Sequence, residues 1–213
     1  MPEILRAEWH AEVLTDSVHT VIPDGCRDLI IVRPTHHRPY CFVSPLYDQT
    51  QWVASQRGTQ ISGFRLTAGS VINEHSLLSS IDHEDMDKAE LLARLEDFVK
   101  LDTAVAEALP CLAQANNSVT TVARSLGVSI RTLQRMMLKQ TARSPSYWLQ
   151  LARSRRAARA LFGDMTDADV AVTYGYADQA HLCRDIKRWF NMTPAQLQNS
   201  HQVSDQLQQP AYA

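Results

Sequence analysis

Two segments in the C-terminal half of the chain repeat one pattern, and this repeat constrains the fold more than any other feature. The first segment, Val122 to Arg135, reads VARSLGVSIRTLQR, and the second, Val170 to Arg184, reads VAVTYGYADQAHLCR. Both begin with Val-Ala, contain a glycine after a short apolar stretch and end in Leu-x-Arg, with one additional residue after the glycine in the second copy. Similarity at this level of detail rarely arises by chance. The sequence therefore predicts one supersecondary unit that is present twice.

The spacing of apolar residues predicts a helix, a tight turn and a second helix in the first copy. Apolar side chains recur at the helical spacing i, i+3, i+4 and i+7 at Val119, Val122, Ala123 and Leu126. Gly127 can enter the left-handed region and turn the chain. Ser129 can cap the helix that follows by accepting a backbone N–H bond.

A helix, a turn and a second helix with an Arg/Gln face form a pattern that is typical of DNA-binding proteins. The second helix is expected to bury Ile130, Leu133 and Met137. Its other face carries Arg131, Gln134, Arg135 and Leu138. In helix-turn-helix proteins this helix lies in the major groove, where arginine and glutamine can pair bidentately with guanine and adenine. Because a single helical hairpin can look like this in any α protein, the repeat is what makes the prediction specific.

The two halves of the chain carry opposite charge. Residues 116–198 contain 12 Lys and Arg against 5 Asp and Glu, a formal charge of +7, whereas residues 1–115 contain 9 against 17. A basic segment beside an acidic one indicates a polyanion-binding half and a half with another task. The alternative is an ordinary solvated charged surface.

The predicted fold class is α+β, with a small β-rich domain followed by an all-α domain of two helix-turn-helix units joined by a linker helix. The regions are a β-rich effector or dimerisation domain over 1–84, a helical connector over 85–115, the tandem helix-turn-helix domain over 116–198 and a flexible tail over 199–213. Strands are predicted at 18–22, 28–32, 40–43, 51–54 and 60–65, where β-branched and aromatic runs are separated by turn residues. The linker helix, over 145–161, would span ~25 Å, which can hold two recognition helices close to the ~34 Å separation of successive major-groove faces.

The repeated units, the linker helix and the stretch GYADQAHLCRDIKRWFNMTP resemble the DNA-binding domain of the AraC/XylS family of bacterial transcriptional regulators, over roughly residues 105–198. The second unit matches the family pattern at Asp178, Gln179, His181, Leu182, Arg184, Phe190 and Pro194. The resemblance implies that the second helix of each unit reads bases. Mapped onto this sequence, the base-reading residues are Arg131, Gln134, Arg135, Gln179, His181, Cys183 and Arg184.

The chain also departs from the family. Ala142 and Asn191 stand where the family usually has glycine, just after each recognition helix, and alanine pays ~1 kcal/mol or more in the left-handed conformation. Asp167 stands where an aliphatic core residue is common. In the N-terminal half, residues 23–32 (PDGCRDLIIV) and 63–69 (GFRLTAG) resemble a small β domain that precedes the DNA-binding domain in some members.

Other positions are expected to contact phosphates, which fixes the register of the protein without reading the sequence. These positions are Ser129, Lys139, Lys187 and Arg188, and Arg131 suits either role. For Arg135 and Arg184 the alternative is a surface salt bridge, but acidic partners are scarce because no Glu follows Glu107.

Several polar residues have a structural interpretation beside a functional one. His181 either contacts DNA or supports the turn, and Asp178 is expected to cap the second recognition helix. Cys26, beside Arg27, would suit a redox sensor if its pKa were lowered, although a buried structural cysteine is the more frequent case. The histidines have no metal-ligand spacing, so no metal site is predicted at His36, His37, His75 or His83.

The sequence is best interpreted as that of a sequence-specific DNA-binding transcriptional regulator without a cofactor. No nucleophile–base pairing is visible, so an enzyme is not expected. The alternative is a non-enzymatic protein-interaction or effector-sensing protein whose helical domain no longer binds DNA. The candidate partners are double-stranded DNA, a small-molecule effector in the N-terminal domain, RNA polymerase and a second copy of the chain. With neither an export signal nor a membrane-spanning run, a cytoplasmic location is expected.

Overall fold

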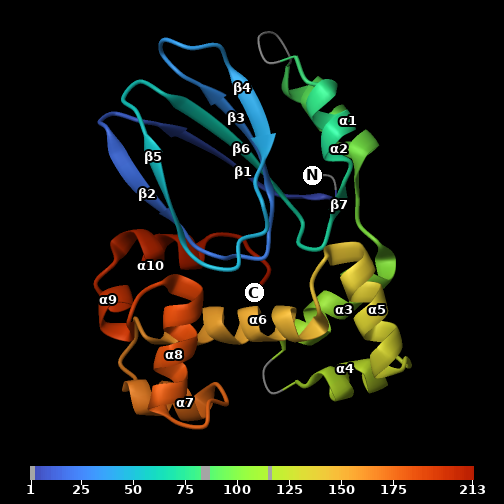
Figure 1. The fold of residues 1–213 in the computed structure, drawn as a ribbon, viewed down its shortest axis with the longest axis vertical. Coiled ribbons are helices and arrows are strands. Elements are labelled where there is room, and N and C mark those ends of the chain that lie inside the picture. The colour runs from blue at the N-terminus through green and yellow to red at the C-terminus, as the bar shows by residue number, and fades with distance from the viewer. Residues whose placement is uncertain (1–2, 83–86, 115–116) are drawn as a thin grey trace.

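The computed structural model describes residues 3–82, 87–114 and 117–213 and arranges them in two layers, a β-rich layer above a helical one (Figure 1). The strands precede nearly all of the helices along the chain, so the predicted α+β class is confirmed. Two predicted boundaries, at 84/85 and 115/116, involve residues outside the described ranges.

The β-rich layer is built on a four-stranded antiparallel sheet with the strand order β1-β6-β3-β4. Its strands are β1 (Leu5–Glu12), β6 (Gln60–Leu66), β3 (Asp28–Arg33) and β4 (Tyr40–Val43). The remaining strands form two ribbons, β2 (Ser17–Val21) with β5 (Gln51–Ser55) and β7 (Val71–Ile72) with β8 (Val99–Lys100). The five predicted strands are found within one residue of their expected ends, whereas β1, β7 and β8 were not predicted.

Two helices cover one face of this sheet, α1 (Glu74–Ser79) and α2 (Lys88–Phe98). Leu29 and Phe64 of the sheet pack against Leu77, Leu91 and Leu95 of these helices in one apolar cluster. The next helix, α3 (Thr103–Ala113), instead buries its apolar side chains among the helices of the lower layer. The predicted connector is therefore divided, because α2 completes the β-rich domain and α3 begins the helical one.

The helical layer is organised around α6 (Pro145–Ala160), which runs across the molecule beneath the sheet (Figure 1). One unit, α4 (Val119–Ser125) and α5 (Ile130–Thr141), packs with Trp148 near the start of α6. The other, α7 (Asp167–Thr173) and α8 (Gln179–Phe190), packs with Ala157 and Leu161 at its end. Each unit thus has its own apolar cluster on one shared helix. The chain ends in α9 (Pro194–Gln198) and α10 (His201–Gln208).

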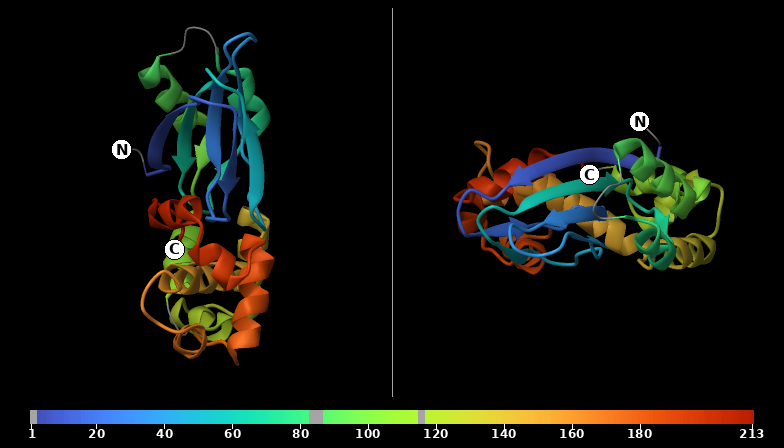
Figure 2. Two further views of the ribbon diagram at one scale, coloured as in Figure 1. Left: turned by 90° about the vertical axis from the view of Figure 1, so that its left-hand side faces the viewer. Right: turned by 90° about the horizontal axis from the view of Figure 1, so that it is seen from above.

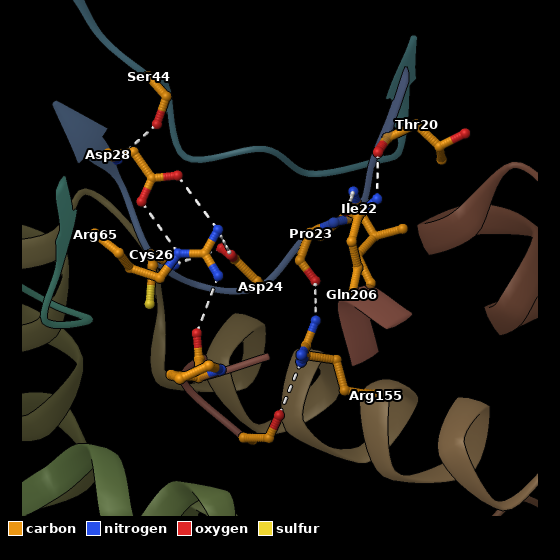
Figure 3. Close-up of polar contacts among 12 residues, drawn as sticks. Thr20, Ile22, Pro23, Asp24, Cys26, Asp28, Ser44, Arg65, Arg155 and Gln206 are labelled. Carbon is orange, nitrogen blue, oxygen red and sulfur yellow. Dashed lines mark hydrogen bonds and ion pairs between the residues drawn. The ribbon is translucent and has the colours of Figure 1, made fainter. Parts of the chain in front are cut away.

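The prediction of a flexible tail over 199–213 is wrong. The tail forms α10, whose Gln206 side chain accepts a hydrogen bond from the N–H of Ile22 (3.1 Å) and donates one to the carbonyl of Thr20 (Figure 3). The prediction rested on the polar composition of the tail and overlooked two apolar residues at i and i+4. Both are buried in the apolar cluster of the second unit: Val203 and Leu207. The tail therefore joins the β-rich layer to the helical layer.

A buried arginine holds the same junction from the linker helix. The Arg155 side chain is 0% exposed; its Nη1 donates to the carbonyl of Pro23 (2.9 Å) and its Nε to the carbonyl of Ala213 (2.8 Å) (Figure 3). Burial lowers the pKa of Arg155 to about 10. These two hydrogen bonds offset part of the cost of burying the charge, although Nη2 has no hydrogen-bond partner among the described residues. Because the carbonyl of Pro23 belongs to the β-rich layer, the contact joins the two layers.

Candidate nucleic-acid interface

The first unit has the predicted helix-turn-helix geometry. Ser118 caps α4, Gly127 turns the chain at φ +68°, and Ser129 caps α5 through the N–H of Thr132 (3.0 Å). The stripe that faces the core contains Leu133 and Met137, both 0% exposed. Ile130, in contrast, is 40% exposed, so its prediction as a buried residue is wrong. Ile130 is the first residue of α5, and the buried residues of this helix begin one turn later, at Leu133.

The second unit repeats this geometry with one insertion. Gly175 turns the chain at φ +73°, and the N–H of Tyr176 bonds to the carbonyl of Ala171 (2.9 Å), as the N–H of Val128 bonds to that of Ala123 in the first unit (2.9 Å). The inserted residue lengthens only the segment before α8. Asp178 caps α8 by accepting from the N–H of His181 (2.6 Å), as predicted.

The predicted base-reading side chains are largely free of partners in the protein. Arg131, Gln134 and Arg135 of α5 are exposed, as are Gln179 and Arg184 of α8. Within the described residues, none of these three arginines forms an ion pair. On α8 a shallow surface depression is lined by Asp178, Gln179, Ala180, Cys183 and Arg184.

The predicted phosphate-contacting residues also lie on the surface of the two units. Lys139 and Lys187 lie exposed in the last turns of α5 and α8, and Ser129 is exposed at the cap of α5. Arg188 is exposed as well, although its Nη1 donates to the side-chain carbonyl of Gln150 (3.1 Å).

Two predicted base-reading residues of α8 are only half exposed. The ring of His181 lies edge-on to the Tyr176 ring, with centroids 5.2 Å apart, and its Nδ1 accepts from the N–H of Ala177 (3.4 Å). This geometry supports the turn, which is the alternative role of His181. Burial raises the pKa of the Cys183 thiol, which keeps it protonated. Base contacts by both residues stay predictions.

Several arginines of the linker helix bind within the protein. Arg153 pairs with Asp185 (3.4 Å) and lies over the Tyr176 ring, and Arg159 donates to the carbonyls of Leu207 and Ala213. Their long-range partners leave no signal in the helical spacing. On α5 and α8, in contrast, Arg131, Arg135, Lys139, Arg184 and Lys187 are exposed and form no ion pair among the described residues.

The two recognition helices stand at opposite ends of α6 and on the same side of it in the views of Figures 1 and 2. Their C-terminal ends lie toward the β-rich layer, and the turns that precede them lie at the far edge of the molecule. This arrangement allows both exposed faces to approach one side of an elongated partner.

Cys26 does not have the environment of a redox sensor. It is buried, and this burial, together with the neighbouring Asp24 carboxylate, raises the pKa of its thiol although Arg65 acts in the opposite direction. A reactive thiolate requires a lowered pKa. Among the described residues no group of three or more His, Cys, Asp or Glu could hold a metal ion, and no helix is long and apolar enough to cross a bilayer. His83 lies outside the described ranges.

Comparison with known proteins places the repeated units in a family. Residues 122–200, which span both units, match the model of a family described as a helix-turn-helix domain. The HTH-type transcriptional regulator RipA of Corynebacterium glutamicum is 37% identical over 92 residues, 43% of this chain and 28% of that protein. The HTH-type transcriptional regulator VirS of Mycobacterium tuberculosis is 29% identical over 126 residues, 54% of this chain and 36% of that protein.

One solved structure is similar to about half of this chain. It is a transcriptional regulator from Chromobacterium violaceum of the group of AraC-type DNA-binding domain-containing proteins, 25% identical, with a TM-score of 0.39 over 51% of this chain and 91% of that one. Residues 122–200 of this chain therefore form a domain of that helix-turn-helix family. The chain spans about a third of the length of the curated relatives that it matches.

The departures from the AraC/XylS pattern have a local geometry that can now be described. Ala142 and Asn191 adopt the left-handed conformation, at φ +54° and +55°, so the backbone is the one for which the family uses glycine. Asp167, at the first position of α7, is half-buried and does not prevent the helix from forming.

Proposed function

We propose that this protein is a sequence-specific DNA-binding regulator of transcription that places α5 and α8 in successive major-groove faces on one side of the duplex. The observation that carries the proposal is the pair of exposed Arg/Gln faces, one on each recognition helix, whose arginines have no acidic partner among the described residues. Arginines with a structural role would pair with acidic side chains of the protein, whereas arginines without such a partner are available to bind a nucleic acid.

The side chains divide into two roles in this proposal. Those that read base edges are Arg131, Gln134, Arg135, Gln179, His181, Cys183 and Arg184, because they lie on α5 and α8. Those that contact phosphates are Ser129, Lys139, Lys187 and Arg188. Phosphate contacts release counterions, so affinity should fall steeply with salt concentration.

The proposal is tested by selection of bound sequences from a random-sequence DNA library, followed by gel-shift titration of the recovered operator. We expect one recurrent sequence and an affinity at least ~10³-fold above that for random DNA. Arg57→Ala, which removes an exposed arginine from the β-rich layer, is the control and should leave the affinity unchanged. Recovery of no preferred sequence, or an affinity that does not depend on salt, would contradict the proposal.

The alternative is a helical domain that no longer binds DNA. It requires the recognition faces to be buried or neutralised by the acidic region of residues 84–107. The described part of that region, from residue 87, includes α2, which packs on the sheet. Glu90 of α2 pairs with Arg94 of the same helix. This placement favours the DNA-binding function.

The β-rich domain is proposed as the part that binds a small-molecule effector, forms a dimer, or both. A hollow of about 390 Å³ opens between this layer and the end of α5, and its lining includes Arg27, Lys139 and Arg143. Apolar side chains exposed on β2, β4 and β5 could supply a dimer contact: Val18, Tyr40, Phe42, Trp52 and Val53. Sedimentation of the full chain distinguishes a dimer from a monomer. We also propose that this regulator contacts RNA polymerase and has a cytoplasmic location.

A further inference from the structure

One loop of the β-rich layer contacts the C-terminal ends of both recognition helices. This loop, residues 44–50 between β4 and β5, runs along the boundary between the two layers (Figure 1). At the end of α8, the N–H of Thr50 donates to the carbonyl of Trp189 (2.9 Å), and the Nδ2 of Asn191 donates to the carbonyl of Thr50 (3.0 Å). Thr50 is only 1% exposed, so this reciprocal contact is shielded from water.

The same loop contacts the end of α5 through side chains. The Nη2 of Arg143 donates to the carbonyl of Leu46 (3.3 Å) and pairs with Asp48 (3.0 Å). From the start of α6, the hydroxyl of Tyr147 donates to the carbonyl of Tyr47 (3.3 Å). The loop therefore holds the matching ends of the two repeated units at the same time.

Asn191 has a special position in this arrangement. It is the counterpart of Ala142, and both residues follow a recognition helix in the left-handed conformation. The Ala142 side chain has no hydrogen-bonding group, whereas the Asn191 amide reaches the β-rich layer. The contact with Thr50 gives a physical reason for an asparagine at a position where the family usually has glycine.

The two units are also joined away from this loop. They share α6 as a common support, Tyr147 and Tyr212 pack against both of their apolar clusters, and Arg155 and α10 join the layers. The loop differs from these contacts because it meets the C-terminal ends of α5 and α8 themselves. A helix fixes the distance between two units along its axis, but each unit can still tilt about its own contact with that helix. A second point of attachment on each unit, supplied by one rigid body, removes this freedom.

We infer that the loop of residues 44–50 fixes the relative orientation of α5 and α8, and thereby selects the separation of the two half-sites that the protein accepts. Asp48, Thr50 and Asn191 act as positioning residues, because they do not themselves face the DNA. Successive base pairs rotate around the duplex axis, so a half-site moved by one base pair presents its edges in a different direction. The inference rests on the proposed DNA-binding function.

The test compares the double variant Asn191→Gly/Asp48→Ala with the control Ala142→Gly, each in the full chain. Glycine accepts the left-handed conformation at positions 142 and 191, so both variants should fold, but only the double variant loses contacts between the loop and the ends of α5 and α8. Affinity is measured for the selected operator and for versions with the half-sites moved together or apart by one base pair. The wild type and Ala142→Gly should lose about tenfold for each shift, whereas Asn191→Gly, combined with Asp48→Ala, should lose less than about threefold.

A purely structural role predicts another result. It would weaken binding to all three DNA molecules by the same factor and leave their ratio at the wild-type value. That result would overturn the inference. A smaller ratio in the Asn191→Gly/Asp48→Ala variant alone would support it.

A second measurement decides the inference without DNA. Spin labels are placed at exposed equivalent positions of the two helices with Arg131→Cys and Ala180→Cys, and their distance distribution is measured by electron paramagnetic resonance. The half-buried native cysteines are first replaced by Cys41→Ser, Cys111→Ser and Cys183→Ser, whereas Cys26 is buried and stays. A broader distribution after Asn191→Gly/Asp48→Ala is expected, and an unchanged one contradicts the inference. If the wild type binds no operator, the proposed function fails while this measurement still decides the orientation.

Discussion

The two helix-turn-helix units share a scaffold but differ in how much of their recognition face is free. When the units are aligned on their Leu-x-Arg ends, Gln134 corresponds to Cys183 and Thr132 to His181. The first unit therefore presents a long amide where the second has a half-buried thiol. The second unit also uses His181 to support its longer turn. The two units therefore keep the same turn and the same buried positions. Their other side chains differ in role, because some are free to contact bases and others support the turn.

The largest expected effect tests whether the two cores are equivalent. Leu133 and Leu182 occupy matching positions and are both 0% exposed. Leu133→Ala and Leu182→Ala should each lower the free energy of unfolding by about 3 kcal/mol, because each leaves a cavity in a packed cluster. Urea denaturation measures the loss. A loss below about 1 kcal/mol at either position would show that the two units are not built alike.

The next effect concerns the arginines that end each pattern. Arg135→Ala and Arg184→Ala should each weaken operator binding by about 1–3 kcal/mol and relax the preference at one base pair. Lys139→Ala should instead weaken specific and random DNA alike and lower the salt dependence by about one unit. Gel-shift titration with single-base operator variants measures both quantities. Equal losses on operator and random DNA for the two arginine variants would argue against base reading.

A smaller effect distinguishes the two left-handed residues. Ala142→Gly should stabilise the protein by about 1 kcal/mol, because alanine is strained at φ +54°. Asn191→Gly should instead lower stability by about 0.5–1.5 kcal/mol, the value of the lost hydrogen bond. Thermal unfolding of the two variants beside the wild type measures both changes. The comparison fails if the two substitutions shift stability in the same direction.

The smallest effect concerns the positions at which the reading faces differ. Gln134→Ala should weaken operator binding by about 1 kcal/mol if its amide pairs with an adenine. Cys183→Ala should change the affinity less than Gln134→Ala does, because the half-buried thiol offers only a weak donor. Titration of both variants against the same operator measures the difference. A larger loss at Cys183 than at Gln134 would reverse the assignment of roles.

The elements with a strong local signal could be predicted from the sequence. Ser129 and Asp178 cap their helices as expected, and the glycine turns of both units are in place, because capping and positive φ depend on residues close in the chain. Strand β1 was missed although Trp9 alternates with polar neighbours, since Glu8 and Glu12 reduce its resemblance to a buried strand.

The contacts between the layers could not be predicted. Arg155 and Gln206 bind main-chain carbonyl and N–H groups that lie more than a hundred positions away in the chain, and such partners leave no periodic pattern. The spacing of a helix shows which residues share a face, but not whether that face meets solvent or another domain. For the same reason the loop of residues 44–50 had no visible role before the fold was known.

The central claim is that two similar helices read one side of a duplex together. Hydroxyl-radical footprinting of the full chain on its selected operator tests it most directly. Two protected segments should appear, separated by about one helical turn, or ~10 base pairs, on the same face of the DNA. Scrambling the bases under either segment should reduce the affinity. A single protected segment, with no loss when the other half of the operator is scrambled, would contradict the claim.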